Sequence, residues 1–297
     1  MQDKGAIKSF LELNITRNWE EHSISINQPG YIDRLLARFN MINAKTTSTP
    51  LELGCQLLKA TQPDKLCDPT RYQELTGSLN HLAVFSHTDI SFAVSKLAQF
   101  NANPTMTHWK AGLHVLRYLK STRNYCITYR RSSIPTRVFG YADADYGSDP
   151  NDRISYTGYV FMCNGGPISW NSHKQSTVAH STMEAEYMAL SDASREALAR
   201  KQFGQELRVR TSESAITILS DNQSALDIAE NPANYRKAKH IDIRYHAIRH
   251  YLRNDLITVD YVPTNAQAAD IFTKALGPHK HHKCTELLGL RNTYEQQ

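Results

Sequence analysis

The sequence has few cysteines and no long apolar run, and each absence argues against a class of protein. Five cysteines are scattered through 297 residues, and none of them forms a C-x-x-C pair. An odd number of separated cysteines favours reduced thiols over a disulfide framework or a cysteine-type zinc site. No run of about eighteen apolar residues occurs, so no membrane span is predicted. The polar start, Met1-Gln-Asp-Lys-Gly, does not resemble a secretory signal.

The sequence also has little excess charge and no serine-hydrolase motif. The formal net charge is +5, so a case for nucleic-acid binding has to rest on where the charges lie. The nucleophile pattern G-x-S-x-G does not occur, which leaves serine hydrolysis without support. Hydrophobic residues make up 40% of the sequence, which is enough for a core. The chain is long enough for one large or two modest domains.

The first of four notable acids follows a strand, and the second begins a helix. Residues 138–142 alternate as an apolar, aromatic strand that ends at Asp143. Glu186 lies a few residues after Ser181-Thr182, where Ser and Thr followed by Glu predict a helix N-terminus with a capping box. A buried acid at either place is costly unless a cation meets it.

The other two acids lie in similar settings. Asp221 follows the short apolar strand 215–220 and opens a strand-to-helix turn. Asp270 is predicted early in a helix that follows the strand 257–262. Strand ends and helix starts are the places where sheet folds assemble their sites.

Convergence of these acids would require cations. At an effective dielectric near 20, two carboxylates about 4 Å apart repel by roughly 4 kcal/mol. Oxygen ligands without cysteine suit Mg²⁺ or Mn²⁺ better than Zn²⁺. A pair of such ions roughly 3.5–4 Å apart is the arrangement that cleaves phosphodiesters.

Seven blocks of sequence, in order, cover roughly half the chain. They are Tyr-Ala-Asp-Ala-Asp-Tyr (141–146), Asp-Arg-Ile-Ser-Tyr-Thr-Gly-Tyr-Val-Phe (152–161), Gly-Pro-Ile-Ser-Trp-Asn-Ser-His-Lys-Gln (166–175), Glu-Ala-Glu-Tyr-Met-Ala-Leu (184–190), Asp-Asn-Gln-Ser-Ala (221–225), Lys-His-Ile-Asp-Ile-Arg-Tyr-His (239–246), and Tyr-Val-Pro-Thr (261–264) with Ala-Asp-Ile-Phe-Thr-Lys-Ala-Leu (269–276). Together they resemble the ribonuclease H domain of a copia-type LTR-retrotransposon Pol polyprotein. The resemblance implies an α/β fold with a ribonuclease H-like mixed sheet flanked by helices.

By this resemblance the catalytic, metal-binding acids fall on Asp143, Glu186, Asp221 and Asp270. Two of these assignments have competitors. Asp145 lies on the same face of the strand as Asp143, and Glu184 competes with Glu186. The spacing to neighbouring family residues favours Asp143 and Glu186.

The first 135 residues resemble the thumb and connection region of the copia-type polymerase. The matching segments are 72–79, 89–94 and 108–120. The polymerase's Tyr-x-Asp-Asp turn does not occur, so we expect no DNA synthesis by this chain alone. The expected organisation is a mostly helical reverse-transcriptase end at 1–135, a ribonuclease H domain at 136–276 and a C-terminal tail at 277–297.

Candidate nucleic-acid contacts lie beside the third acid and in a basic segment. Asn222 and Gln223, on position alone, are candidates for contacts with 2′-hydroxyls. Lys239 and Arg244 lie in a basic segment with interleaved aromatics that suits a phosphate backbone. A solvated helix face explains the basic segment equally well.

The resemblance implies an endonuclease that cuts the RNA strand of RNA–DNA hybrids with two Mg²⁺ ions, Mn²⁺ being an alternative. The expected partners are the hybrid and the upstream reverse-transcriptase part of the same polyprotein. No association with a membrane is expected. The expected location is the cytoplasm, in virus-like particles, with the nucleus second. Departures from the family at Thr76, His87, Tyr146 and His173 keep a second hypothesis open, a catalytically silent remnant that binds nucleic acid. An integrase-type transferase fits less well, because integrases use three acids.

Overall fold

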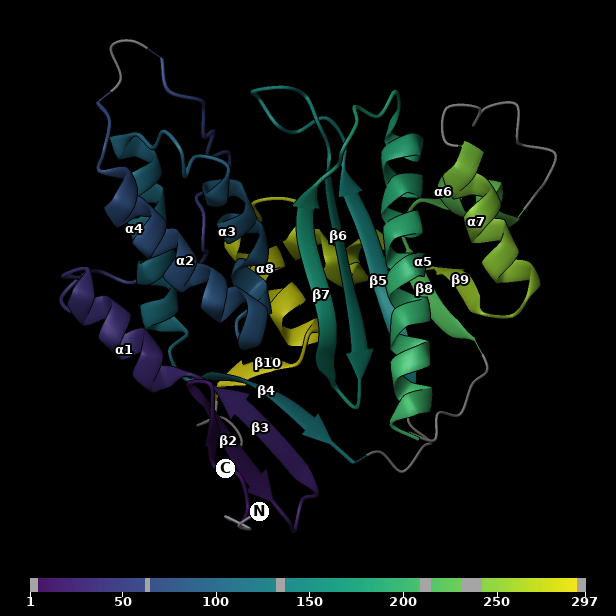
Figure 1. Ribbon diagram of the computed structural model, residues 1–297, viewed down its shortest axis with the longest axis horizontal. Coiled ribbons are helices and arrows are strands. Elements are labelled where there is room, and N and C mark those ends of the chain that lie inside the picture. The colour runs from purple at the N-terminus through teal and green to yellow at the C-terminus, as the bar shows by residue number, and fades with distance from the viewer. Residues whose placement is uncertain (1–4, 62–64, 132–136, 209–214, 231–241, 293–297) are drawn as a thin grey trace. The chain divides into compact units, whose positions relative to one another are not determined.

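The computed structural model describes residues 5–61, 65–131, 137–208, 215–230 and 242–292 (Figure 1). The chain forms two compact units. Unit 1 contains Met1–Arg131 and Ala275–Gln297, and unit 2 contains Ser132–Lys274. Within the described residues, we find no helix that is both long and apolar enough to cross a membrane.

Unit 2 is built on a mixed five-stranded sheet. Its strands are β5 (Val138–Asp145), β6 (Tyr156–Cys163), β7 (Gly166–Lys174), β8 (Ile216–Ser220) and β9 (Ile257–Tyr261), in the order β7-β6-β5-β8-β9. β5, β6 and β7 pair antiparallel, whereas β8 pairs parallel with both β5 and β9. The sequence predicted this combination, because close strands pair antiparallel and strands separated by helices pair parallel.

Helices cover this sheet. They are α5 (Thr182–Glu206), α6 (Gln223–Glu230), α7 (Asp242–Arg253), and the 3-10 helices η4 (Thr264–Ala266) and η5 (Ala268–Phe272). α5 packs on β5, β6 and β8, while η5 packs on β6 and β5. Ala142 and Ala144 belong to the core cluster that includes α5 residues, so strand alternation directs Asp143 to the other face of β5. The expected ribonuclease H-like mixed sheet with flanking helices is confirmed.

The helix that was predicted to carry Asp270 is a short 3-10 helix instead. All five of its residues are buried, and the Gln267 side chain accepts a hydrogen bond from Ala269 N at 3.1 Å. Gln267 Nε2 also donates to Ala142 O at 3.0 Å. Tertiary contacts therefore hold this segment against the sheet, and 3-10 helices rarely extend beyond such a short piece.

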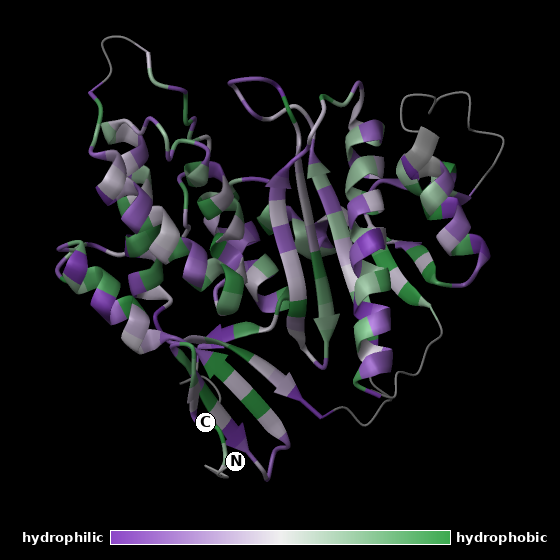
Figure 2. Cartoon of the chain, viewed as in Figure 1, coloured by the Kyte–Doolittle hydropathy of each residue, from purple (hydrophilic) through white to green (hydrophobic). Residues whose placement is uncertain are grey.

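Unit 1 has its own antiparallel sheet, in the order β1-β2-β3-β4-β10. Its strands are β1 (Ser9–Phe10), β2 (Leu13–Asn18), β3 (Ser23–Asn27), β4 (Tyr125–Arg130) and β10 (Leu290–Asn292). Figure 2 shows hydrophobic residues alternating with pale, near-neutral ones along β3, a period of two that is typical of a strand. The sequence predicts one strand over 7–15, but it is interrupted at Leu11 and Glu12, whose φ angles are 48° and 67°.

The sequence predicts helices over 31–39, over 69–100 with a break near 86–89, and over 108–120, and helices of unit 1 lie in all three places. The helices of unit 1 are α1 (Pro29–Arg38), α2 (Pro69–Phe85), η1 (Thr88–Ile90), α3 (Ser91–Ala98), α4 (Met106–Ser121) and α8 (Pro278–Leu287). The predicted break near residues 86–89 is the turn into η1. The helices α2 and α4 begin at side-chain caps, Asp68 and Thr105 respectively.

The prediction of a C-terminal tail at 277–297 was wrong for residues 278–292. These residues form α8 and β10, and β10 pairs antiparallel with β4 in unit 1. Cys284 and Leu288 are fully buried, and Leu290 is 2% exposed. Burial of these apolar residues stabilises the segment, although it also contains three histidines and two lysines.

Candidate metal centre

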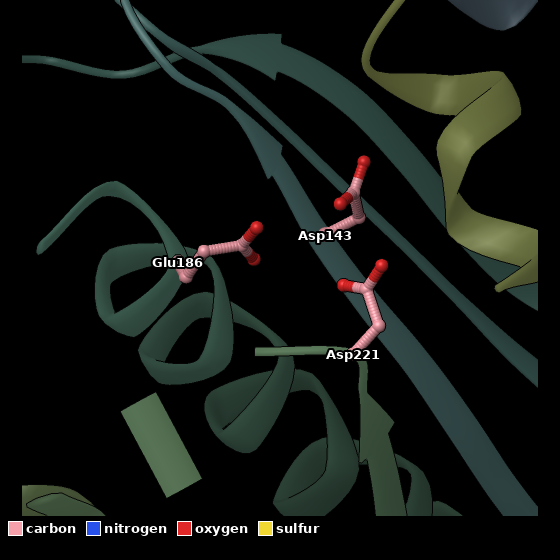
Figure 3. Close-up of side chains that lie close together, drawn as sticks. All are labelled: Asp143, Glu186 and Asp221. Carbon is pink, nitrogen blue, oxygen red and sulfur yellow. The ribbon is translucent and has the colours of Figure 1, made fainter. Parts of the chain in front are cut away.

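Three carboxylates of unit 2 converge (Figure 3). Asp143 lies on β5, Glu186 near the start of α5, and Asp221 directly after β8. Figure 3 shows their carboxyl groups turned toward a shared space. One oxygen of each carboxylate lies within 4.8 Å of the others, so the group could hold a metal ion. Asp143 is 2% exposed and Glu186 is 6% exposed.

The start of α5 separates the roles of its two competing glutamates. Ser181 Oγ accepts a hydrogen bond from Glu184 N at 3.1 Å, and Glu184 Oε2 accepts one from His180 N at 2.8 Å. Glu184 is thus engaged at the helix cap, although its side chain binds N of His180, one residue before the N-cap Ser181, and not N of Ser181 as in a capping box. Glu186 Oε2 instead accepts a hydrogen bond from Ala144 N of β5 at 3.1 Å. Only Glu186 of the two belongs to the converging group.

The two aspartates at the end of β5 also differ. The Thr273 hydroxyl donates a hydrogen bond to Asp143 Oδ2, and both residues are buried. Asp145 is half-buried and is not a member of the converging group. Gly158, which pairs with Asp143 on β6, makes room for this contact, because a Cβ there would lie 2.8 Å from Thr273 Cγ2.

Asp270, the fourth predicted acid, is buried beside the group and not within it. Its Oδ1 lies 2.7 Å from Lys274 Nζ, and the same ammonium lies 3.6 Å from Asp143 Oδ2. A lysine therefore stands between the first and the fourth predicted acids. Sequence reasoning missed both Thr273 and Lys274, although their spacing of three and four residues from Asp270 is that of one helical turn.

Burial is the leading cause of the raised pKa values of two of these carboxylates. Burial raises the pKa of Asp143 to about 6, with the Lys274 charge opposing it. Burial, followed by the charges of Asp143 and Asp221, raises the pKa of Glu186 to about 9. For Lys274, burial acts to lower the pKa, but the nearby Asp143 and Asp270 charges raise it overall.

The donor set fits a hard divalent cation. Three carboxylates supply only oxygen ligands, the kind that Mg²⁺ and Mn²⁺ prefer. Two of them carry raised pKa values because their charged forms are poorly compensated. A cation among them would supply the missing compensation.

Comparison with known proteins places the chain in a family. No family model matches it. It is 37% identical to the retrovirus-related Pol polyprotein from transposon TNT 1-94 of Nicotiana tabacum, over 98% of this chain and 22% of the polyprotein. It is 38% identical to that of transposon RE1 of Arabidopsis thaliana, over 85% of this chain and 17% of the polyprotein. The chain belongs to the retrovirus-related Pol polyproteins of transposons.

This Pol-family chain spans about a fifth of the length of these relatives. Among solved structures, it is similar to LC11-RNase H1 in complex with RNA/DNA hybrid, with 16% identity and a TM-score of 0.36. That similarity covers 46% of this chain and 94% of the other. The strand order and directions of unit 2, not this similarity, carry the fold assignment.

Of the residues predicted to contact nucleic acid, three lie within the described residues and Lys239 lies outside them. Asn222 Oδ1 accepts a hydrogen bond from Ala225 N at 3.0 Å, as a cap at the start of α6 does. Gln223, the first residue of α6, is exposed. Arg244 is half-buried on α7, and Lys239 lies outside the described residues. Their roles in binding stay predictions.

Proposed function

We propose that unit 2 of this Pol-family chain is a ribonuclease H, a metal-dependent endonuclease that hydrolyses the RNA strand of RNA–DNA hybrids. The observation that carries the proposal is the convergence of Asp143, Glu186 and Asp221. They come from β5, α5 and the end of β8, which are far apart in sequence. Membership of the Pol family and the ribonuclease H-like sheet support the same activity.

In this proposal Asp143, Glu186 and Asp221, with Asp270 beside them, hold magnesium, for which manganese can substitute. Bound metal of this kind activates a water for attack on the phosphodiester and neutralises the leaving oxygen. The chain's own groups fix the ligands, since Thr273 holds Asp143 and Ala144 N holds Glu186. Cleavage leaves a 3′-hydroxyl and a 5′-phosphate.

Selection of the RNA strand requires contacts to 2′-hydroxyls, the group that distinguishes RNA from DNA. We assign these contacts to Asn222 and Gln223. Because Asn222 Oδ1 accepts the hydrogen bond from Ala225 N, its Nδ2 is the group offered to the substrate. Lys239 and Arg244 are proposed to bind phosphates of the same duplex.

We also propose that this chain makes no DNA and works with the upstream reverse-transcriptase part of its polyprotein. The absence of a Tyr-x-Asp-Asp sequence supports the first statement. The second is supported by relatives that are roughly five times longer than this chain.

The substrate panel that tests the proposal compares an RNA–DNA hybrid with single-stranded RNA, duplex RNA and duplex DNA, each end-labelled. We expect Mg²⁺-dependent cleavage of the RNA strand of the hybrid alone, with 5′-phosphate products, and none after chelation by EDTA. Hybrid binding without any cleavage would support a silent remnant and overturn the nuclease. Cleavage of duplex DNA as well would overturn the proposed specificity.

A further inference from the structure

Lys274 lies beside the carboxylate group, between Asp143 and Asp270. Its ammonium is 2.7 Å from Asp270 Oδ1 and 3.6 Å from Asp143 Oδ2. Its side chain is 37% exposed, whereas both carboxylates are 3% exposed. The lysine thus reaches inward from a partly open position to two buried acids.

Local structure holds Lys274 in this position. Lys274 N donates a hydrogen bond to Asp270 O at 3.3 Å, which continues the turn that ends η5. This places the lysine side chain over Asp270, four residues earlier. The neighbouring Thr273 hydroxyl binds Asp143 Oδ2, so consecutive residues contact the same carboxylate.

The acids therefore enclose two different positions for positive charge. Asp143, Glu186 and Asp221 enclose the first, with oxygens within 4.8 Å of one another. Asp143 and Asp270 flank the second, and Lys274 Nζ lies there. An ammonium is a compact point charge with three donors, and it neutralises part of the negative charge that a second ion would need.

We propose that Lys274 is a built-in cation of the metal centre, so that this chain takes up one divalent ion in place of the pair that its resemblance to ribonucleases H implies. The inference rests on the proposed metal centre but not on the choice of nucleic-acid substrate. In the nuclease, Lys274 is a positioning residue that fixes Asp143 and Asp270 and supplies the charge of the absent ion.

The test counts bound Mn²⁺ by electron paramagnetic resonance of the free ion, with the full chain and no nucleic acid. The wild-type chain should bind one Mn²⁺. Lys274→Met should bind two, the second at least tenfold more tightly than any second ion in the wild type. Lys274→Arg keeps the charge and should bind one.

Lys201→Met is the matched control, because it removes the same charge elsewhere. Lys201 lies on α5, fifteen residues after Glu186, or about 22 Å along the helix. The Lys201→Met variant should bind one Mn²⁺, as the wild type does. Two ions of similar affinity in the wild type, or one ion in Lys274→Met, would overturn the role of Lys274. No Mn²⁺ in any variant would overturn the metal centre itself.

Thermal unfolding supplies a second measurement, for which Lys274→Gln keeps a hydrogen-bonding side chain without the charge. Saturating Mn²⁺ should raise the Tm of Lys274→Gln more than that of the wild type, because the variant gains an additional bound ion. Equal rises in the two proteins would count against the proposal even if Lys274→Met failed to fold.

Discussion

At the scale of single residues, the centre combines acids that the sequence predicts with partners that it does not. Asp143, Glu186 and Asp221 were predicted because each lies at a strand end or helix start, and the structure brings them together. Thr273 and Lys274 were missed because only the packing of η5 turns them toward Asp143. The altered pKa values could not be predicted either, since burial is their leading cause.

Those pKa values predict how metal and pH act together on stability. Folding raises the pKa of Asp143 from 3.8 to about 6 and that of Glu186 from 4.5 to about 9. At a pH between the unfolded and folded pKa values of each acid, the folded state keeps a proton that the unfolded state has released. Without divalent metal, the contribution of these acids to the free energy of unfolding therefore falls as the pH rises from about 4 to about 9.

We expect Mg²⁺ to stabilise the chain increasingly over that range, because its binding requires the ionised carboxylates. For Asp143 alone, the metal-free loss in the free energy of unfolding over this pH range is on the order of 3 kcal/mol. One unit of pKa shift corresponds to about 1.4 kcal/mol, and folding raises this pKa from 3.8 to about 6. Urea unfolding at several pH values, with Mg²⁺ or with EDTA, measures this loss and the effect of Mg²⁺. A Mg²⁺ effect that stays constant or shrinks as the pH rises would contradict this account.

At the scale of elements, the helix and strand order of unit 2 was predictable, but the form of the segment that carries Asp270 was not. From about residue 137 the sequence predicts three strands, a long helix, a strand, a short helix, a helix around 242–252 and a strand. These are β5 to β9 and α5 to α7, and they were predictable because each is a local pattern. The segment Ala268–Phe272 is a 3-10 helix held by long-range contacts. One is the bond from Gln267 Nε2 to Ala142 O, and another is the bond from Ser172 Oγ to Phe272 O at 2.6 Å.

Close packing at Gly158 gives a test of this element. A Cβ at Gly158 would lie 2.5 Å from Phe272 Cβ, so Gly158→Ala should displace η5. We expect a loss of about 1–3 kcal/mol in the free energy of unfolding and weaker Mn²⁺ binding.

Gly204→Ala on α5 is the control, because its new Cβ would meet nothing within 4 Å. In a helix this change should be neutral or stabilise by up to about 1 kcal/mol. Chemical unfolding and Mn²⁺ titration compare the two variants. If Gly158→Ala were as stable as Gly204→Ala and bound Mn²⁺ with the same affinity, η5 would not depend on the space at Gly158.

At the scale of the whole molecule, the sequence predicted three consecutive segments, whereas the chain returns from unit 2 to unit 1 at its C-terminal end. Pairing of β10 with β4 joins residues more than 160 positions apart, a contact that local patterns cannot indicate. The sequence predicts strands over 7–15 and 23–26 but neither β4 nor β10, so only part of the sheet of unit 1 was predicted.

Removal of residues 278–297 should therefore affect the two units unequally. The truncation exposes the edge of β4 and the buried residue Cys126, which pairs with Arg291. We expect faster proteolysis within residues 1–131 and unchanged resistance within 137–208, which belong to unit 2. Limited proteolysis followed by mass spectrometry measures both in one sample. Unchanged resistance of unit 1 would contradict a structural role for α8 and β10.

We propose above all that Asp143, Glu186 and Asp221 bind a shared cation that is required for cleavage of RNA. Cleavage of the hybrid by the Asp221→Asn variant tests this most directly. Asp227→Asn is the matched control, an exposed residue on α6 with the same chemical change. We expect Asp221→Asn to bind the hybrid as the wild type does, yet to cleave it at least about 100-fold more slowly. Asp227→Asn should bind and cleave normally. Full cleavage activity in Asp221→Asn would contradict the account.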